Sequence, residues 1–167
     1  TSGAGSSHHI GLAALGLGLA DDANLFKHIA YGGGAEAITN LLGGHVDATA
    51  TIWSEAAPYI ESGDFVPLFC NGPETPDSAG DLPCAADYDL TSDGGTWYAF
   101  AAPAGTDQAI VDLLESTILD IMAQPETVQT FENLGNPVVL LAQKEISEKW
   151  SSGYKNAEAT LKAIGML

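Results

Sequence analysis

Glycine and hydroxyl side chains gather at the start of the sequence, just before a segment with the pattern of a helix. Residues 1–7 read TSGAGSS, and His8 and His9 follow them. A helix N-terminus presents unpaired N–H groups and a partial positive charge, so such a segment can hold an anion without a basic side chain. Two more glycine-rich segments precede predicted helices, YGGGAEA at 31–37 and APAGTD at 102–107. Taken singly, each segment is also typical of a tight turn between a strand and a helix.

Residue spacing argues against several other chemistries. The first segment lacks the lysine of a GxxxxGK[ST] phosphate loop and the third glycine of a GxGxxG turn, so it does not predict nucleotide binding. The four histidines, His8, His9, His28 and His45, show no spacing typical of a metal site. No GxSxG elbow occurs, and a serine beside a histidine on one turn cannot form a catalytic triad. The sequence therefore predicts no catalytic residue, no metal and no cofactor.

Length and charge narrow the class of protein. The chain has 167 residues, enough for one domain or for a small domain and part of another. It contains 22 acidic residues against 5 lysines and no arginine, which gives a formal net charge of −17. Nucleic acid and anionic membrane surfaces bind clustered lysine and arginine, so neither is a predicted partner. The longest apolar run, residues 10–20, is too short and too rich in glycine to insert into a membrane. The sequence shows no signal peptide, and because it starts inside a motif at Thr1 we expect further residues to precede it.

Hydrophobic patterning predicts strands and helices that alternate about every 15 to 20 residues in the first part of the chain. Such alternation is typical of βαβ units around a mainly parallel sheet, so the predicted fold class is α/β. A long loop with several prolines, residues 71–95, follows, and the rest of the chain is mostly helical, with an interruption expected at Gly153. The predicted helices cover 7–20, 34–43, 54–62, 106–124, 125–135 and 143–167, and the predicted strands cover 26–31, 46–52, 65–70, 96–103 and 136–142.

Two cysteines, Cys70 and Cys84, flank the first part of the long loop. A disulfide between them would close a loop of about 15 residues and stabilise the fold by about 3 kcal/mol. Two buried thiols are the other interpretation, and both stay open. The spacing is not that of a zinc site.

Four motifs in a fixed order give a more specific indication than any single loop. They are TSGAGSSHH (1–9), YGGGAEAITNLLGGHVDA (31–48), PYIESGDFVPL (58–68) and TWYAFAAPAGTDQAIVDLLES (96–116). Together they resemble the solute-binding receptors of tripartite tricarboxylate transporters, the Bug family, whose patterns are close to TSGxGSxxH, YKGGxxALxxLLGGxVDA, PxIxxGxLRxL and SWxGLxAPAGTPxxVVxxLN. The resemblance spans nearly the whole chain.

The resemblance implies a type II periplasmic-binding-protein fold, in which two lobes close on a small carboxylate. Residues 1–96 would form the second ligand-binding lobe. Residues 97–167 would supply a crossover strand and the carboxy-terminal helical segment of the first lobe, whose amino-terminal part is absent. The implied function is non-enzymatic capture of a di- or tricarboxylate or similar acid, in the periplasm or elsewhere outside the cytoplasm, for the membrane components of a transporter. A ligand-sensing domain of a signalling system with the same fold is the alternative.

The resemblance also implies a set of ligand-binding residues. Thr51 stands where many members of the family have an aspartate, and the lysine that usually precedes the glycine turn is missing, so the identity of the acid stays open. The implied residues are Thr1, Ser2, Gly5, Ser6 and Ser7 from the first loop, Tyr31, Gly33, Gly34 and Ala35 from the second loop, and Thr51.

Overall fold

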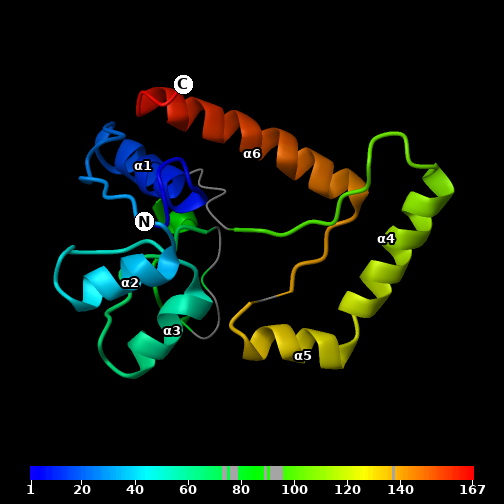
Figure 1. Cartoon of the computed structure of the whole chain (residues 1–167), viewed down its shortest axis with the longest axis horizontal. Helices are drawn as coiled ribbons and strands as arrows, with labels where there is room; N and C mark the ends of the chain where they lie inside the picture. Colours follow the sequence, from blue (N-terminus) through cyan, green and yellow to red (C-terminus); the bar gives the residue numbers. More distant parts are fainter. Residues whose placement is uncertain (73–74, 76–78, 89, 91–95, 137) are drawn as a thin grey trace. The chain divides into compact units, whose positions relative to one another are not determined.

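The chain divides into two units in the computed structural model (Figure 1). Unit 1 contains Thr1–Thr96 and Gly153–Leu167, and unit 2 contains Trp97–Ser152. No helix among the described residues is long and apolar enough to cross a membrane. The assignment of the chain to two lobes of a receptor stays a prediction. The structure describes residues 1–72, 75, 79–88, 90, 96–136 and 138–167.

Helix α1 (Ser7–Ala20) has the bounds that the sequence predicts. Ser6 is its N-cap, because the Ser6 Oγ accepts a hydrogen bond from the backbone N–H of His9 at 3.2 Å. Gly16 is buried at the point where the chain folds back over the helix, and a Cβ on Gly16 would lie only 2.5 Å from the carbonyl oxygen of Asp22. Glycine lowers intrinsic helix propensity, so this close packing must stabilise α1.

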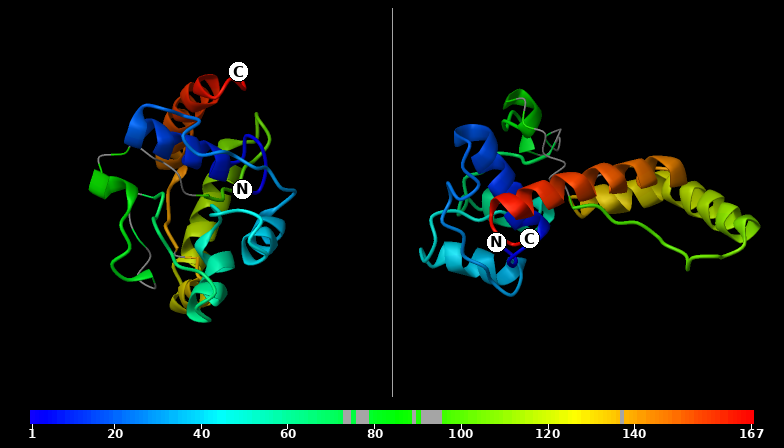
Figure 2. Two further views of the ribbon diagram at one scale, coloured as in Figure 1. Left: turned by 90° about the vertical axis from the view of Figure 1, so that its left-hand side faces the viewer. Right: turned by 90° about the horizontal axis from the view of Figure 1, so that it is seen from above.

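Helices α2 (Gly34–Leu42) and α3 (Trp53–Glu61) contact each other within unit 1 (Figure 2). The buried side of α2 is provided by Ala37 and Ile38, which are 1% and 4% exposed. Helix α3 starts one residue before the predicted start and continues through Pro58. The rest of the unit 1 core includes the short 3-10 helix η2 (Ala85–Tyr88), in which Ala85 is completely buried, and Thr160 near the end of the chain.

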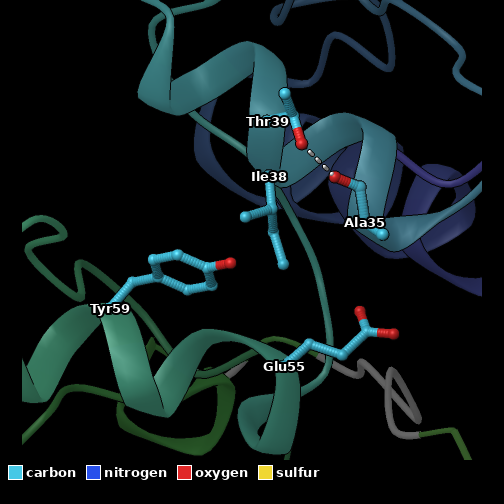
Figure 3. A pocket seen from close by; sticks show the side chains of 5 residues that line it. All are labelled: Ala35, Ile38, Thr39, Glu55 and Tyr59. Atoms are coloured by element: carbon cyan, nitrogen blue, oxygen red, sulfur yellow. Dashed lines mark hydrogen bonds between the residues drawn. The ribbon is translucent and has the colours of Figure 1, made fainter.

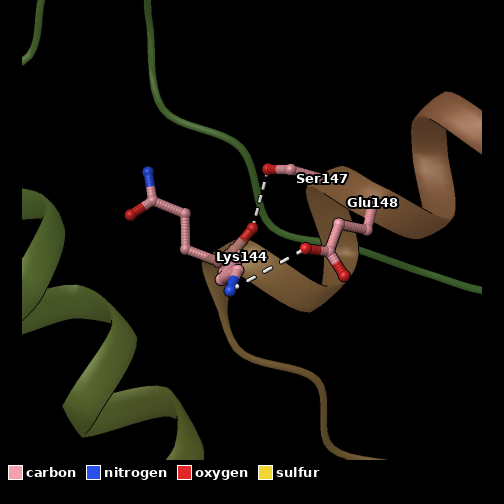
Figure 4. A network of polar contacts seen from close by, with 4 residues as sticks. Lys144, Ser147 and Glu148 are labelled. Carbon is pink, nitrogen blue, oxygen red and sulfur yellow. Dashed lines mark hydrogen bonds and ion pairs between the residues drawn. The ribbon is translucent and has the colours of Figure 1, made fainter.

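Helix α6 (Gln143–Ala163) is continuous, so the predicted interruption at Gly153 is wrong. A single glycine costs a helix only about 1 kcal/mol relative to alanine. Ion pairs one turn apart support the helix on both sides of this glycine, Lys144 with Glu148 at 4.0 Å and Lys162 with Glu158 at 2.6 Å. At the start of the helix, the Ser147 hydroxyl also donates to the carbonyl oxygen of Gln143 at 2.7 Å (Figure 4).

Unit 2 contains helices α4 (Gln108–Met122) and α5 (Pro125–Asn133), which contact each other. Helix α4 starts two residues after the predicted start at residue 106. Its N-cap is Asp107, because the Asp107 carboxylate accepts the N–H of Ala109 at 2.9 Å. The predicted start of α5 at Pro125 is confirmed. Its predicted end at Gly135 is also close to the observed one, since Gly135 directly follows the C-cap with φ +72°.

The predicted sheet is not formed by the described residues, among which no strand occurs. Two isolated pairings have the hydrogen-bond pattern of parallel strands. Cys70 pairs with Cys84, and Thr1 donates to Ile29 and accepts from Tyr31, both at 3.0 Å. A strand needs a neighbouring backbone along its length in order to satisfy its hydrogen bonds. In the predicted strand at 65–70, apolar side chains stay exposed, and Val66, for example, is 79% exposed.

Candidate ligand-binding site

The first glycine-rich loop, residues 1–7, is folded by its own glycines and hydroxyls. Gly3 has φ +144° and Gly5 has φ +71°, conformations that favour glycine. The Ser6 hydroxyl donates to the carbonyl oxygen of Gly3 at 2.8 Å while it caps α1. A Cβ on Gly5 would come within 3.3 Å of the methyl carbon of Met166. The loop therefore needs glycine at these positions in order to turn into the helix.

The two predicted ligand-binding loops lie next to each other. The Thr1 amino group donates to the Ile29 carbonyl oxygen, and the Tyr31 N–H donates to the Thr1 carbonyl oxygen, both at 3.0 Å. Gly3 approaches the same segment, since a Cβ on Gly3 would be 3.8 Å from the Tyr31 carbonyl oxygen. Backbone hydrogen bonds thus join residues that lie about 30 positions apart in the sequence.

The second loop leads into α2, and carboxylates of the chain itself lie at this helix N-terminus. Gly33 is the N-cap and makes no side-chain capping bond. The Gly32 N–H donates to the Glu36 carboxylate at 2.7 Å. The Glu55 carboxylate lies so close to Gly34 that a Cβ there would be 2.2 Å from its oxygen, and the Thr51 hydroxyl donates to that carboxylate. This side of the site therefore offers hydrogen-bond acceptors.

A groove between α2 and α3 continues from this loop (Figure 3). Its volume is about 250 Å³, and both Glu55 and the ring of Tyr59 border it from α3. Ile38 supplies an apolar wall from α2. Of the predicted residues, Ala35 lines the groove, where its carbonyl oxygen accepts a hydrogen bond from the Thr39 hydroxyl at 2.9 Å.

Three histidine rings surround the first loop. The Nδ1 of His9 accepts the N–H of Gly5 at 3.0 Å, and the rings of His9 and His28 are stacked with their centroids 3.6 Å apart. The His28 Nε2 lies 2.6 Å from the Thr1 Oγ1, and the His8 Nδ1 lies 2.8 Å from the Ser2 Oγ. These distances place all three imidazoles at hydrogen-bond range from loop groups.

Burial lowers the pKa of all three imidazoles, His8, His9 and His28. The Glu55 carboxylate opposes this effect at His8, where it raises the pKa. The neighbouring ring of His9 lowers the pKa of His28 further. The histidines are therefore mainly neutral at pH 7.

The structure brings most of the predicted site residues together within unit 1, and it gives two of them internal roles. Ser6 caps α1, and the exposed Ser7 hydroxyl lies 3.3 Å from the Thr96 hydroxyl.

Sequence reasoning missed Glu36, Glu55 and His28. An acidic residue at the third position of a helix is typical of N-terminal capping, so Glu36 could have been found from the sequence. The others are recognised only from their contacts in space.

Comparison with known proteins gives the family. Residues 1–166 match the tripartite tricarboxylate transporter family receptor, TctC, and the chain belongs to this family of solute-binding receptors. Over the whole of its length the chain is similar in structure to part of a TctC solute-binding protein from Polaromonas, crystallised with no ligand, with a TM-score of 0.77 at 21% sequence identity. The fold is therefore that of a solute-binding protein.

A relative in sequence leads to the same family. The UPF0065 protein in the gbd 5′ region of Cupriavidus necator is 24% identical over 143 residues, which cover 84% of this chain and 43% of that protein. The Polaromonas structure is covered over 56% of its chain. The sequence thus spans about half the length of the proteins it matches.

Proposed function

We propose that the chain supplies ligand-binding loops of an extracytoplasmic receptor that captures a small organic acid, such as a di- or tricarboxylate, for a tripartite tricarboxylate transporter. The receptor binds the acid without chemical change and presents it to the membrane components of the transporter. The observation that carries this proposal is the backbone pairing of Thr1 with residues 29–31, which joins both glycine-rich loops into one site. Family membership supports the location and the transporter partner.

The first loop is the better place for a carboxylate of the ligand. Lys27 is the only lysine before residue 144 and the chain has no arginine, so the donors that this chain offers to an anion there are backbone amides, hydroxyls and imidazoles. The loop enters the N-terminus of α1, where the helix dipole favours a negative charge. Ordered water can fill the remaining gaps between donors and ligand.

The second loop favours a different part of the ligand. The carboxylates of Glu36 and Glu55 already lie at the N-terminus of α2, so a second anionic group would be repelled there. A hydroxyl or amino group of the ligand could instead donate a hydrogen bond to these oxygens. The proposed ligand class is therefore small acids, and hydroxy or amino acids within that class should bind best.

A charge inserted into the first loop tests the proposal. Ser6→Asp keeps an N-cap for α1, since aspartate caps as well as serine, but it loses the hydroxyl that donates to the Gly3 carbonyl oxygen and adds a negative charge beside the amides. We expect the melting temperature to fall by about 2 to 5 °C, while the affinity for a bound carboxylate falls at least about tenfold. Thermal shift and calorimetry with succinate, malate and citrate on the purified protein measure both effects.

A matched variant controls for the added charge. Gln124→Asp places the same charge at the N-cap of α5 in unit 2, where the glutamine makes no capping bond. This variant should bind like the wild type. Absence of a thermal shift or binding heat with all three acids would contradict carboxylate capture, and equal affinity of the wild type and Ser6→Asp would exclude the first loop as the anion site.

A further inference from the structure

The histidines around the first loop occupy the groups that this loop would offer to an anion. The Gly5 N–H donates to the Nδ1 of His9, so this nitrogen carries no proton in the structure. The hydroxyls of Thr1 and Ser2 are within hydrogen-bond distance of the rings of His28 and His8. An incoming carboxylate therefore has to compete with the imidazoles for an amide and for two hydroxyls.

Protonation of His9 would change this arrangement. An imidazolium has a hydrogen on both ring nitrogens, so its Nδ1 can no longer accept the Gly5 N–H. The amide and the protonated ring nitrogen are then two donors close to each other, without an acceptor between them. A carboxylate oxygen is a suitable acceptor for both, and the hydrogen bond from the charged ring is stronger than one from a neutral ring.

The charges that face these rings limit how many protons they can take up. His9 and His28 are stacked at 3.6 Å, so positive charges on both rings would repel each other strongly. His8 faces the Glu55 carboxylate. Before an anion binds, these surroundings and burial keep the stacked pair mainly neutral. A bound carboxylate brings the opposite charge that the pair lacks.

We propose that His9 and His28 form a proton-accepting pair of the ligand site, which takes up about one proton from solvent when a carboxylate binds and then holds that carboxylate as an imidazolium. The proton adds to a ring nitrogen and no covalent bond of the ligand changes. This role deepens the proposed function and rests on it, because the binding of a carboxylate is what favours the charged ring. It also provides a positive charge beside two loops, residues 1–7 and 31–35, that contain neither arginine nor lysine.

Uptake of a proton makes affinity depend on pH in a defined direction. Binding raises the pKa of the pair, so affinity increases as pH falls from the pKa of the complex toward the lower pKa of the free protein, by up to about tenfold per pH unit. Stability of the protein without added acid follows the opposite direction. The lowered pKa values mean that the unfolded chain binds more protons than the folded chain near pH 6.5, so stability decreases as pH falls through this range.

Calorimetry in two buffers of different ionisation enthalpy measures the proton directly. Malate, whose two carboxylates are ionised at both pH values, is titrated into the purified wild-type protein at pH 7.5 and 6.5. We expect an uptake of about 0.5 to 1 proton per malate and a Kd about three to ten times lower at pH 6.5. His9→Gln and His28→Gln should both reduce the uptake and flatten the pH dependence, whereas His45→Gln, a histidine after α2 with none of these contacts, should leave them unchanged.

The possible outcomes distinguish the role of the histidine pair from the broader proposal that the protein captures a carboxylate. Malate binding with no proton uptake by the wild-type protein would overturn the role of the histidine pair and leave carboxylate capture supported. Persistence of full uptake in both His9→Gln and His28→Gln would also overturn it. If succinate, malate and citrate all give no binding heat, carboxylate capture fails and the histidine role fails with it.

Discussion

Replacing Gly16 with alanine is expected to lower the free energy of unfolding by about 2 kcal/mol, although alanine is the better helix former. The chain reverses at Asp21, which adopts the left-handed conformation at φ +54°, and this reversal places the Asp22 carbonyl oxygen over Gly16. A Cβ at 2.5 Å from that oxygen requires a backbone shift, because no flexible side-chain end can move aside. Overpacking of this kind destabilises a fold by more free energy than the higher helix propensity of alanine contributes.

The same substitution on another helix gives the matched control. A Cβ on Gly153 in α6 would meet no atom within 4 Å, so Gly153→Ala should raise the free energy of unfolding by about 0.5 to 1 kcal/mol. Urea denaturation followed by circular dichroism measures both variants. The sign of the two effects is the decisive result: stabilisation by Gly16→Ala would contradict the close contact between α1 and the following turn.

Helices were easier to predict from this sequence than strands, for a physical reason. A helix satisfies its backbone within one segment, so the local run of apolar residues was sufficient to predict the bounds of α1. The ion pairs that support α6 on both sides of Gly153 are also local. Each of them stabilises the helix only slightly, so their effect on helix stability is sufficient only when it is summed over the whole helix. A strand depends on a neighbour, and the predicted strand at 65–70 pairs only through Cys70 among the described residues.

The candidate site could also be predicted only where it depends on residues that are close together in the sequence. The motifs in the sequence include the Thr1–Ser7 loop and the Tyr31–Ala35 loop, and the resemblance to a family indicated that they act together. The stacking of His28 on His9 could not be predicted, because 19 positions separate them and neither belongs to a metal-like pattern. The position of Glu55 beside Gly34 likewise depends on how α3 packs against α2.

Acidic side chains affect the proposed site at short range more than through the net charge. The formal charge of −17 would repel an acid at a distance, but physiological salt screens exposed charges beyond about 8 to 10 Å. Glu36 and Glu55, by contrast, lie directly at the second loop. They make the two ends of the site chemically different, with donors at the first loop and acceptors at the second. We propose that selectivity among acids follows from this difference between the two ends.

Oxidation of the Cys70 and Cys84 thiols to a disulfide is expected to raise the melting temperature of the protein by about 5 to 10 °C. The two residues form a parallel β-bridge, with the Cys70 N–H donating to Pro83 at 2.8 Å and the Ala85 N–H donating to Cys70 at 3.0 Å. Bridged strands are about 4.8 Å apart and paired side chains share a face, which is within the separation that a disulfide spans. The bond would join the two ends of the segment between residues 70 and 84, which stabilises the fold by limiting the conformations of the unfolded chain.

A glutathione redox buffer supplies the oxidant for the measurement. Disulfide exchange joins the two sulfurs with loss of two hydrogens, while glutathione disulfide is reduced to two glutathione molecules. Mass spectrometry after thiol alkylation should count no reactive cysteine in the oxidised protein and two after reduction, and the melting temperature should fall on reduction. Cys84→Ser serves as the control, because its melting temperature should not respond to the redox buffer. Two alkylated cysteines in the oxidised sample would contradict the pairing. Two thiols that lie next to each other in one protein should form a disulfide with each other faster than either reacts with another molecule.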